Sequence, residues 1–183
     1  MARRRPSLAV RERKIAFPPI IGGRPRVLIL GSMPGDASLR LGEYYGHRRN
    51  AFWAIMTDLL GLPADADYRQ RTAALVAGGI ALWDVLAACE RDGSLDAAIR
   101  PESIQVNDFH WLFADYPGIE LIVFNGGTAE REYHKRVRPG LMPADQAIPM
   151  RRLPSTSPAY AGMPLAEKMS VWCTALAELL RQP

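Results

Sequence analysis

Four short apolar runs recur along the chain, and segments with helical periodicity separate them. The runs are RVLIL at 26–30, GIALW at 79–83, IELIVF at 119–124 and the weaker MRRLP at 150–154. Apolar, β-branched runs of this length are typical of strands buried on both faces of a parallel sheet. The alternation predicts an α/β fold, a three-layer α/β/α sandwich around a central, mainly parallel four-stranded sheet.

The segments between the runs have apolar residues at helical spacing. Helices are predicted at 50–60, 68–77, 127–137 and 165–180, with a short helix capped by Asn107 and Asp108 and ending at Phe113. A chain of 183 residues, of which 48% are hydrophobic, suits one compact domain. Every apolar run is far shorter than the ~20 residues of a membrane-spanning helix. The arginine-rich N-terminus lacks the following apolar stretch of a secretory signal.

The positive charge is concentrated at the N-terminus. Residues 1–14 hold six basic residues and one acidic residue, whereas the rest of the chain has 17 basic and 18 acidic residues. We therefore divide the chain into a basic, flexible tail at 1–14 and a single domain at 15–183. The tail is either an ordinary solvated segment or a source of non-specific attraction to DNA phosphates.

The two cysteines, Cys89 and Cys173, lie in apolar or helical surroundings and form no CxxC pair. This spacing favours neither a zinc site nor an iron–sulfur cluster. It indicates two buried thiols in a reducing compartment, so a cytoplasmic protein is expected. The sequence suggests no cofactor or metal, and we expect a monomer.

Polar or glycine residues follow each predicted strand. They are GSMPGDASL after the first strand, Asp84 after the second, Asn125-Gly126-Gly127 after the third and Ser155-Thr156-Ser157-Pro158 after the fourth. Ligands of parallel α/β sheets bind outside the carboxyl ends of the strands. The four junctions therefore predict a site that hydrogen-bonds a planar or anionic ligand. GSMPG is neither a Walker loop nor GxGxxG, and alone it could be a simple turn.

Two further segments suit a nucleic-acid ligand. In YYGHRRNAFW, Tyr45 is next to a glycine, so its ring can present a face to a flat ligand. In STSPAYAG, three hydroxyls precede a rigid Ser-Pro step and can hold phosphate oxygens. Phe52 and Trp53, by contrast, are expected in the helix core.

The segments LILGSMPGDASL, YYGHRRNAFW, GIALWDVLAACERDGSLDAAI, FNGGTA and LPSTSPAYA occur in order between residues 27 and 172. Together they resemble the uracil-DNA glycosylase superfamily, and within it the hypoxanthine (deoxyinosine)-DNA glycosylase group, family 6. The tail lies outside this resemblance. The resemblance implies a monofunctional DNA glycosylase that removes hypoxanthine from deaminated DNA, with uracil as a second candidate base.

The resemblance also implies roles for individual residues. Met33 stands where most of the superfamily has a water-activating Asn or Asp, and the hypoxanthine group looks to use the residue corresponding to Asn50 instead. Tyr45 falls where an aromatic ring stacks on the flipped base, and Asp84 falls where the uracil enzymes place the Asn that reads the base edge. Ser155 stands where the usual His-Pro-Ser-Pro motif has its histidine, so the histidine that the uracil enzymes use at this position is absent here.

Chemical reasoning from the residues keeps a second candidate for water activation. Hydrolysis of an N-glycosidic bond places positive charge on the sugar and negative charge on the leaving base, so the site needs a positioned water and hydrogen bonds to the base. Asn50 can orient a water without changing its own protonation, and Asp36 could act as a base instead. Asn50 could also cap the following helix, which is compatible with a catalytic role.

The remaining candidates are assigned to the base or to the DNA strand. The predicted base-binding residues are Tyr45, Asp84, Gly31, Ser32, Met33 and Asn125, and the predicted DNA-binding residues are His47, Arg48, Arg49, Ser155, Thr156, Ser157, Tyr160 and Met163. Tyr160 or Met163 could wedge into the gap left by the flipped base. His47 could equally cap a helix, and Asn125 could equally satisfy a turn. A uracil-specific glycosylase and a non-catalytic nucleic-acid or nucleotide-binding module stay as alternative functions.

Overall fold

A four-stranded parallel sheet forms the centre of the computed structural model, which describes residues 13–180. The strands are β2 (Val27–Gly31), β3 (Ile80–Asp84), β6 (Leu121–Asn125) and β7 (Met150–Leu153), in the order β3-β2-β6-β7. All three pairings are parallel. The predicted sheet is therefore confirmed, with strand ends within two residues of those expected.

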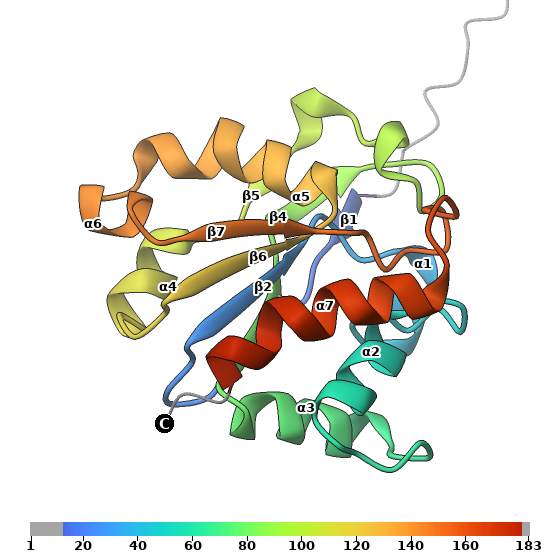
Figure 1. Cartoon of the computed structure of the whole chain (residues 1–183). Helices are drawn as coiled ribbons and strands as arrows, with labels where there is room; N and C mark the ends of the chain where they lie inside the picture. The colour runs from blue at the N-terminus through green and yellow to red at the C-terminus, as the bar shows by residue number, and fades with distance from the viewer. Residues whose placement is uncertain (1–12, 181–183) are drawn as a thin grey trace, which may run out of the picture.

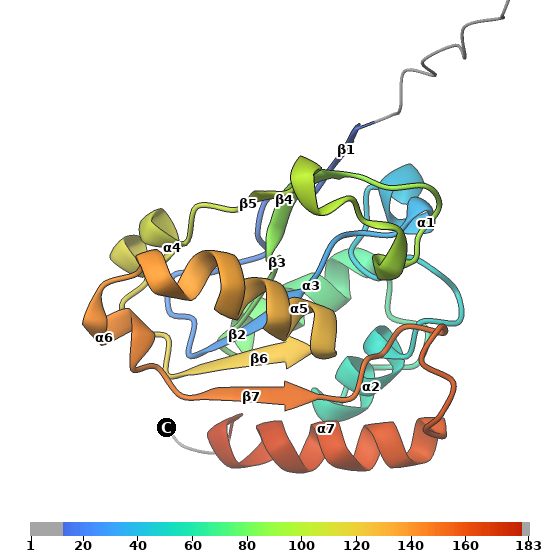
Figure 2. The same ribbon diagram turned by 90° about the horizontal axis from the view of Figure 1, so that it is seen from above.

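Helices cover both faces of this sheet, as the two views in Figures 1 and 2 show. One face carries the helices α2, α3 and α7, and the other carries α4, α5 and α6. Their bounds are α2 (Phe52–Leu59), α3 (Tyr68–Ala77), α4 (Phe109–Asp115), α5 (Gly127–Glu132), α6 (Pro143–Gln146) and α7 (Leu165–Leu180). The predicted α/β/α sandwich is confirmed. Within residues 13–180, none of the helices has the length and apolar character needed to cross a membrane.

Aromatic side chains anchor the helices to the sheet on both faces. Trp172 of α7 is fully buried, and its ring meets Phe52 of α2 at 6.2 Å between centroids. On the opposite face Tyr133 packs edge-on against Phe109 of α4 and lies 5.2 Å from Phe124 of β6. Truncating such a buried aromatic to alanine costs about 3–5 kcal/mol. The helices on both faces therefore hold the central strands, and the loops at their ends, in place.

A second, antiparallel sheet was not predicted from the sequence. It consists of β1 (Arg13–Ile15), β4 (Leu86–Glu90) and β5 (Gln105–Val106), in the order β1-β4-β5. β4 starts two residues after β3 ends, so the sequence GIALWDVLAACE reads as one apolar run. Arg13 and Lys14, which the sequence placed in the basic tail, lie in β1. Residues 1–12 of that tail lie outside the described part.

Several short helical turns complete the chain. They are α1 (Asp36–Leu41), η1 (Asp96–Ala98), η2 (Pro101–Ser103), the π-helical turn η3 (Tyr133–Val137) and η4 (Arg138–Gly140). The predicted helix at 127–137 is thus split into α5 and η3. α1 ends at Gly42, whose φ of 69° lies in the left-handed region that glycine favours. α1 and η1 both flank the loop after β2, where the site lies.

Candidate active site

A cavity of about 690 Å³ lies at the carboxyl ends of the parallel strands. Every strand junction of the central sheet contributes to it, as predicted. Among the predicted site residues, the cavity is lined by Gly31, Ser32, Met33, Tyr45, His47, Asn50, Asp84, Asn125, Ser155, Thr156, Ser157 and Tyr160. Asp36, Arg48, Arg49 and Met163 are not among its lining residues.

Asp84 is the buried carboxyl of this cavity. It ends β3, pairs with Gly31 of β2 and is 3% exposed. Its Oδ2 atom has no hydrogen-bond partner among the described residues. Burial and, to a lesser extent, the negative charge of Asp96 raise the pKa of Asp84, Arg91 opposes them, and the resulting pKa is about 8. At neutral pH Asp84 is therefore mainly a neutral carboxyl, which offers both a donor and an acceptor.

Gly31 leaves the room that the Asp84 carboxyl occupies. A Cβ atom on residue 31 would stand 2.3 Å from Asp84 Oδ1 and 3.1 Å from the hydroxyl oxygen of Tyr45. Any side chain at this position would therefore displace both polar groups. This close approach explains the glycine directly after the first parallel strand.

Tyr45 is held in an uncommon backbone conformation. Its φ is 54°, which is unusual for a residue with a side chain. One ring face stacks on Phe52, with centroids 4.0 Å apart and an interplanar angle of 25°. No described group lies at the distance and angle of a hydrogen bond to the buried hydroxyl, and burial raises its pKa while the nearby Asn125 side chain opposes the shift, so the hydroxyl stays protonated. Stacking of the ring on a flipped base stays a prediction.

Asn50 lies in the turn before α2 and has a fixed side chain. Its Oδ1 accepts a hydrogen bond from the backbone N–H of Phe52 at 3.0 Å, and its own N–H donates to the His47 carbonyl at 2.8 Å. The next residue, Ala51, donates to the carbonyl of Thr156 at 3.0 Å. The helix thus begins after Asn50, with Ala51 as its N-cap residue, while Asn50 lines the cavity.

His47 also takes part in this turn. Its Nδ1 accepts a hydrogen bond from the backbone N–H of Arg49 at 3.1 Å. The side chain is exposed and lines the cavity. Its turn-stabilising contact is therefore present, and a contact with DNA phosphate stays a prediction.

Asn125 and Thr156 bond to each other across the third and fourth strand junctions. Asn125 Nδ2 donates to the Thr156 hydroxyl, and the Thr156 backbone N–H donates to Asn125 Oδ1, both at 2.8 Å. Thr156 is only 1% exposed. These bonds give both residues a structural role. For Asn125 this agrees with the alternative that its side chain satisfies a turn. Their contacts with a base or with phosphate stay predictions.

Asp36 points to the second sheet rather than to the cavity. It forms an ion pair with Lys14 of β1, and its backbone N–H donates to the Ser94 hydroxyl at 2.9 Å. The hydrogen bond from Lys14 is the largest cause that lowers the pKa of Asp36. The structure therefore does not bring Asp36 together with Asn50.

Asp96 faces the cavity and was not among the predicted residues. Both of its carboxylate oxygens lie 2.9 Å from the hydroxyl oxygen of Ser32, which donates to them. Arg91, with a completely buried side chain, forms an ion pair with it at 3.5 Å. Asp96 belongs to the segment GSLDAAI. That segment carried part of the family resemblance, but no residue of it had been assigned a role because it reads as a loop between strands.

A smaller hollow of about 310 Å³ lies beside the cavity and shares Tyr160 with it. It is also lined by the predicted DNA-binding residues that the cavity lacks. This hollow includes Arg48, Arg49, Tyr160 and Met163. Lys168 of α7 donates to the carbonyl of Tyr160 at 2.7 Å and lies 5.1 Å from the centre of its ring. These predicted DNA-binding residues therefore lie together beside the cavity, next to Ser157.

The fold and the cavity define a class: an α/β/α protein with a polar ligand site at the carboxyl edge of a parallel sheet. The chain matches the uracil DNA glycosylase superfamily over residues 18–179. It belongs to this superfamily, which confirms the family that the sequence motifs indicated.

Individual relatives agree with the family. A hypoxanthine DNA glycosylase of Methanosarcina barkeri is 40% identical over 115 residues, which are 62% of this chain and 72% of that protein. A hypoxanthine DNA glycosylase of Methanosarcina acetivorans is 38% identical over 126 residues, 68% of this chain and 78% of that protein. A solution NMR structure of a candidate uracil DNA glycosylase from Methanosarcina acetivorans has a TM-score of 0.76 and 33% identity. It covers 93% of this chain and 100% of that one.

Proposed function

We propose that the protein is a DNA-repair glycosylase that hydrolyses the N-glycosidic bond of hypoxanthine in deaminated DNA, with uracil as a second substrate. Its superfamily and the two relatives named hypoxanthine DNA glycosylase support this function. The observation that carries it is the unpartnered Asp84 carboxyl in a cavity large enough for an extrahelical base. A nucleic-acid base supplies the in-plane donors and acceptors that such a group requires.

Base recognition follows from the protonation of Asp84. Hypoxanthine presents a carbonyl acceptor next to a ring N–H donor. A neutral carboxyl can donate to the first and accept from the second, as an amide does. The Tyr45 hydroxyl, also without a geometric partner, supplies a further donor in the same cavity. Uracil carries the same carbonyl and N–H pair, which is why it is included as a second substrate.

Asn50 is proposed to orient the attacking water. Met33 cannot do so, because its thioether is only a weak acceptor. The Asn50 side chain is held by the bond from Phe52 N–H, so its amide is oriented before substrate binds. Asp36 is less suited to this role, because Lys14 and Ser94 hold it outside the cavity lining.

The test is single-turnover cleavage of duplexes that contain inosine, uracil or xanthine, with alkali to break the abasic sites. We expect Asn50→Ala to lower the rate by ~10²–10³-fold, as loss of an oriented polar group in an active site does, while DNA binding changes little. Asp36→Ala serves as the matched comparison. If Asp36→Ala abolishes excision and Asn50→Ala is mild, the water-orienting role belongs to Asp36.

The same assay separates the alternative functions. Release of uracil without hypoxanthine would identify a uracil-specific enzyme. Tight binding of the damaged duplex without release of any base would identify a non-catalytic binding module. Both cysteines of the described chain are free thiols, Cys89 buried as expected and Cys173, contrary to expectation, only partly buried. Free thiols support the proposal of a reducing, cytoplasmic location. We also propose that the protein acts on DNA as a monomer.

A further inference from the structure

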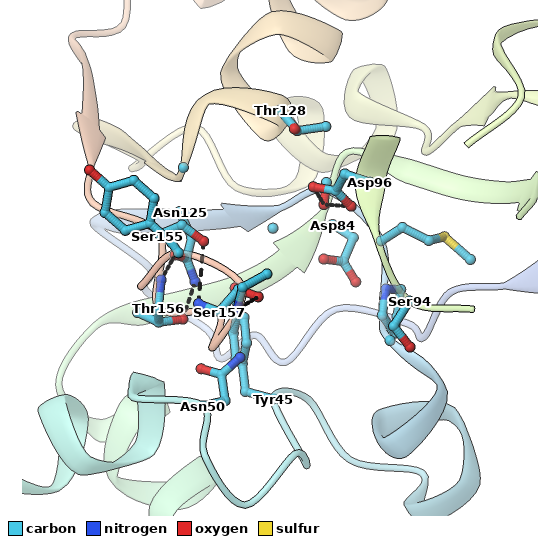
Figure 3. A pocket seen from close by; sticks show the side chains of 18 of the residues that line it. Tyr45, Asn50, Asp84, Ser94, Asp96, Asn125, Thr128, Ser155, Thr156 and Ser157 are labelled. Carbon is cyan, nitrogen blue, oxygen red and sulfur yellow. Dashed lines mark hydrogen bonds between the residues drawn. The ribbon is translucent and has the colours of Figure 1, made fainter. Parts of the chain in front are cut away.

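The cavity contains two aspartates in different environments. Asp84 is buried and has an unpartnered oxygen, whereas Asp96 has a side chain that is 34% exposed and forms an ion pair with Arg91. Figure 3 shows Asp96 beyond Asp84 from Asn50, so the cavity has a polar group on either side of Asp84. Two carboxyls in such different surroundings commonly have separate chemical roles.

The contacts of Asp96 hold it against the loop that follows β2. Ser32 donates its hydroxyl to the carboxylate at 2.9 Å, and Ser32 directly precedes Met33 in the chain. Arg91 in turn donates to the Pro34 carbonyl at 2.5 Å and to the Gly93 carbonyl at 3.1 Å. The η1 segment is thus tied to the loop on both sides of Met33. A carboxylate thus lies against the loop whose third residue is the thioether Met33.

Other carboxylates near the cavity are less suited to face a positive charge. Glu130 of α5 lines the cavity, but its Oε2 is ion-paired with Arg152 at 3.0 Å, a closer pair than the 3.5 Å between Asp96 and Arg91. Asp84 is mainly neutral near pH 7, since burial raises its pKa to about 8. Asp36 is paired with Lys14 outside the cavity lining. Asp96 is therefore the carboxylate of the described cavity best placed to face a positive charge on the substrate.

We propose that Asp96 is a catalytic carboxylate that stabilises the positively charged sugar formed when the base leaves. This proposal rests on the proposed glycosylase function and names one more residue of that site. The C1′–N bond breaks with its electron pair leaving on the base, and the oxygen of water then bonds to C1′. The proton that this water loses neutralises the departed base through solvent. Asp96 gains and loses no atom; it supplies negative charge close to the cation.

The test uses two uncleavable DNA duplexes that differ in charge at the sugar position. One carries a pyrrolidine abasic-site analogue, which is cationic, and the other carries neutral tetrahydrofuran. Both dissociation constants are measured at pH 6.5, below the pKa of Asp84, for wild type, Asp96→Asn and Asp92→Asn. Asp92 is an exposed carboxylate on the same loop that is not among the cavity-lining residues. The ratio of the two constants cancels any general loss of folded protein.

We expect wild type to bind the cationic duplex more tightly than the neutral one. Asp96→Asn should reduce that preference by about tenfold or more, because a close charge pair in a partly buried site is lost. Asp92→Asn should keep it. The single-turnover rate of Asp96→Asn on inosine DNA should fall at least as much as the preference does.

Each other result has a definite meaning. An unchanged preference in Asp96→Asn, or wild type without any preference for the cation, overturns the role of Asp96 and leaves the glycosylase function standing. Equal losses for Asp96→Asn and Asp92→Asn show only a general effect of charge and also overturn it. Wild type that binds neither analogue more tightly than undamaged duplex overturns the proposed function, and the role of Asp96 with it.

Discussion

Replacing Asp84 by Asn should stabilise the protein, and the gain should grow with pH. The folded state raises the pKa of Asp84 from its ordinary value of 3.8 to about 8. Between these values the folded protein holds a proton that the unfolded chain has lost. The stability of wild type therefore falls as pH rises from about 4 to 8 because of this group. An asparagine has a similar shape and hydrogen-bonding capacity but no proton to lose.

The size of the effect follows from the linkage between pKa and stability. Each pH unit between the two pKa values is worth about 1.4 kcal/mol. The difference in the free energy of unfolding between Asp84→Asn and wild type should therefore increase by up to about 4 kcal/mol from pH 5 to pH 8. Asp84 is 3% exposed, so solvent screening weakens the effect little.

Urea denaturation of both proteins at pH 5, 6, 7 and 8 measures this difference. Asp36→Asn is the control, since contact with Lys14 lowers the pKa of Asp36 and the group stays ionised over the whole range. Its effect on stability should be constant from pH 5 to 8. If the Asp84→Asn difference is constant as well, the carboxyl is ionised in the folded state. Base reading by a neutral Asp84 would then be wrong.

Three further results are expected. Release of hypoxanthine by wild type should decline as pH rises through about 8, the pKa of Asp84, whereas the Asp84→Asn rate should lack this decline, because an amide keeps its donor and acceptor at every pH. Equal loss on both bases with a lower Tm would instead indicate a structural role. Gly31→Ala should impair single-turnover excision far more than duplex binding, because its Cβ would stand 2.3 Å from Asp84 Oδ1; full activity would contradict the cavity geometry. Deletion of residues 1–12 should weaken DNA binding and flatten its salt dependence, and a lost rate at saturating enzyme would instead place this segment in the active site.

The sequence predicted the central sheet because both of its faces are buried. Residues 27–30 of β2 are completely buried, so nearly every position of such a strand must be apolar. The second sheet lacks this signature. β1 has three residues and β5 has two, and β4 has a register shift between Leu86 and Ala88. Its formation depends on pairings distant in sequence, which periodicity cannot reveal.

The site could be predicted where it depends on strand ends and not where it depends on loop packing. Asp84 and Asn125 lie in the cavity because their strands end there. Two contacts between separate segments decide that Asp96 lines the cavity and Asp36 does not. Lys14 of β1 binds Asp36, and Ser32 binds Asp96. Neither contact follows from the spacing of residues in the chain.

The distribution of hydrogen bonds separates the structural polar groups of the cavity from those that can bind a ligand. Asn125 and Thr156 bond reciprocally, so they join two strand junctions and stiffen the rim. Asp84 Oδ2 and the Tyr45 hydroxyl are buried without a geometric partner, although an unpaired buried polar group costs about 1–3 kcal/mol. A base bound between them would supply the missing hydrogen bonds and relieve that cost. The hydrogen bonds that these two groups lack in the free protein would thus form only with the flipped base. Their free energy would offset part of the cost of extracting the base from the duplex, which is a few kcal/mol.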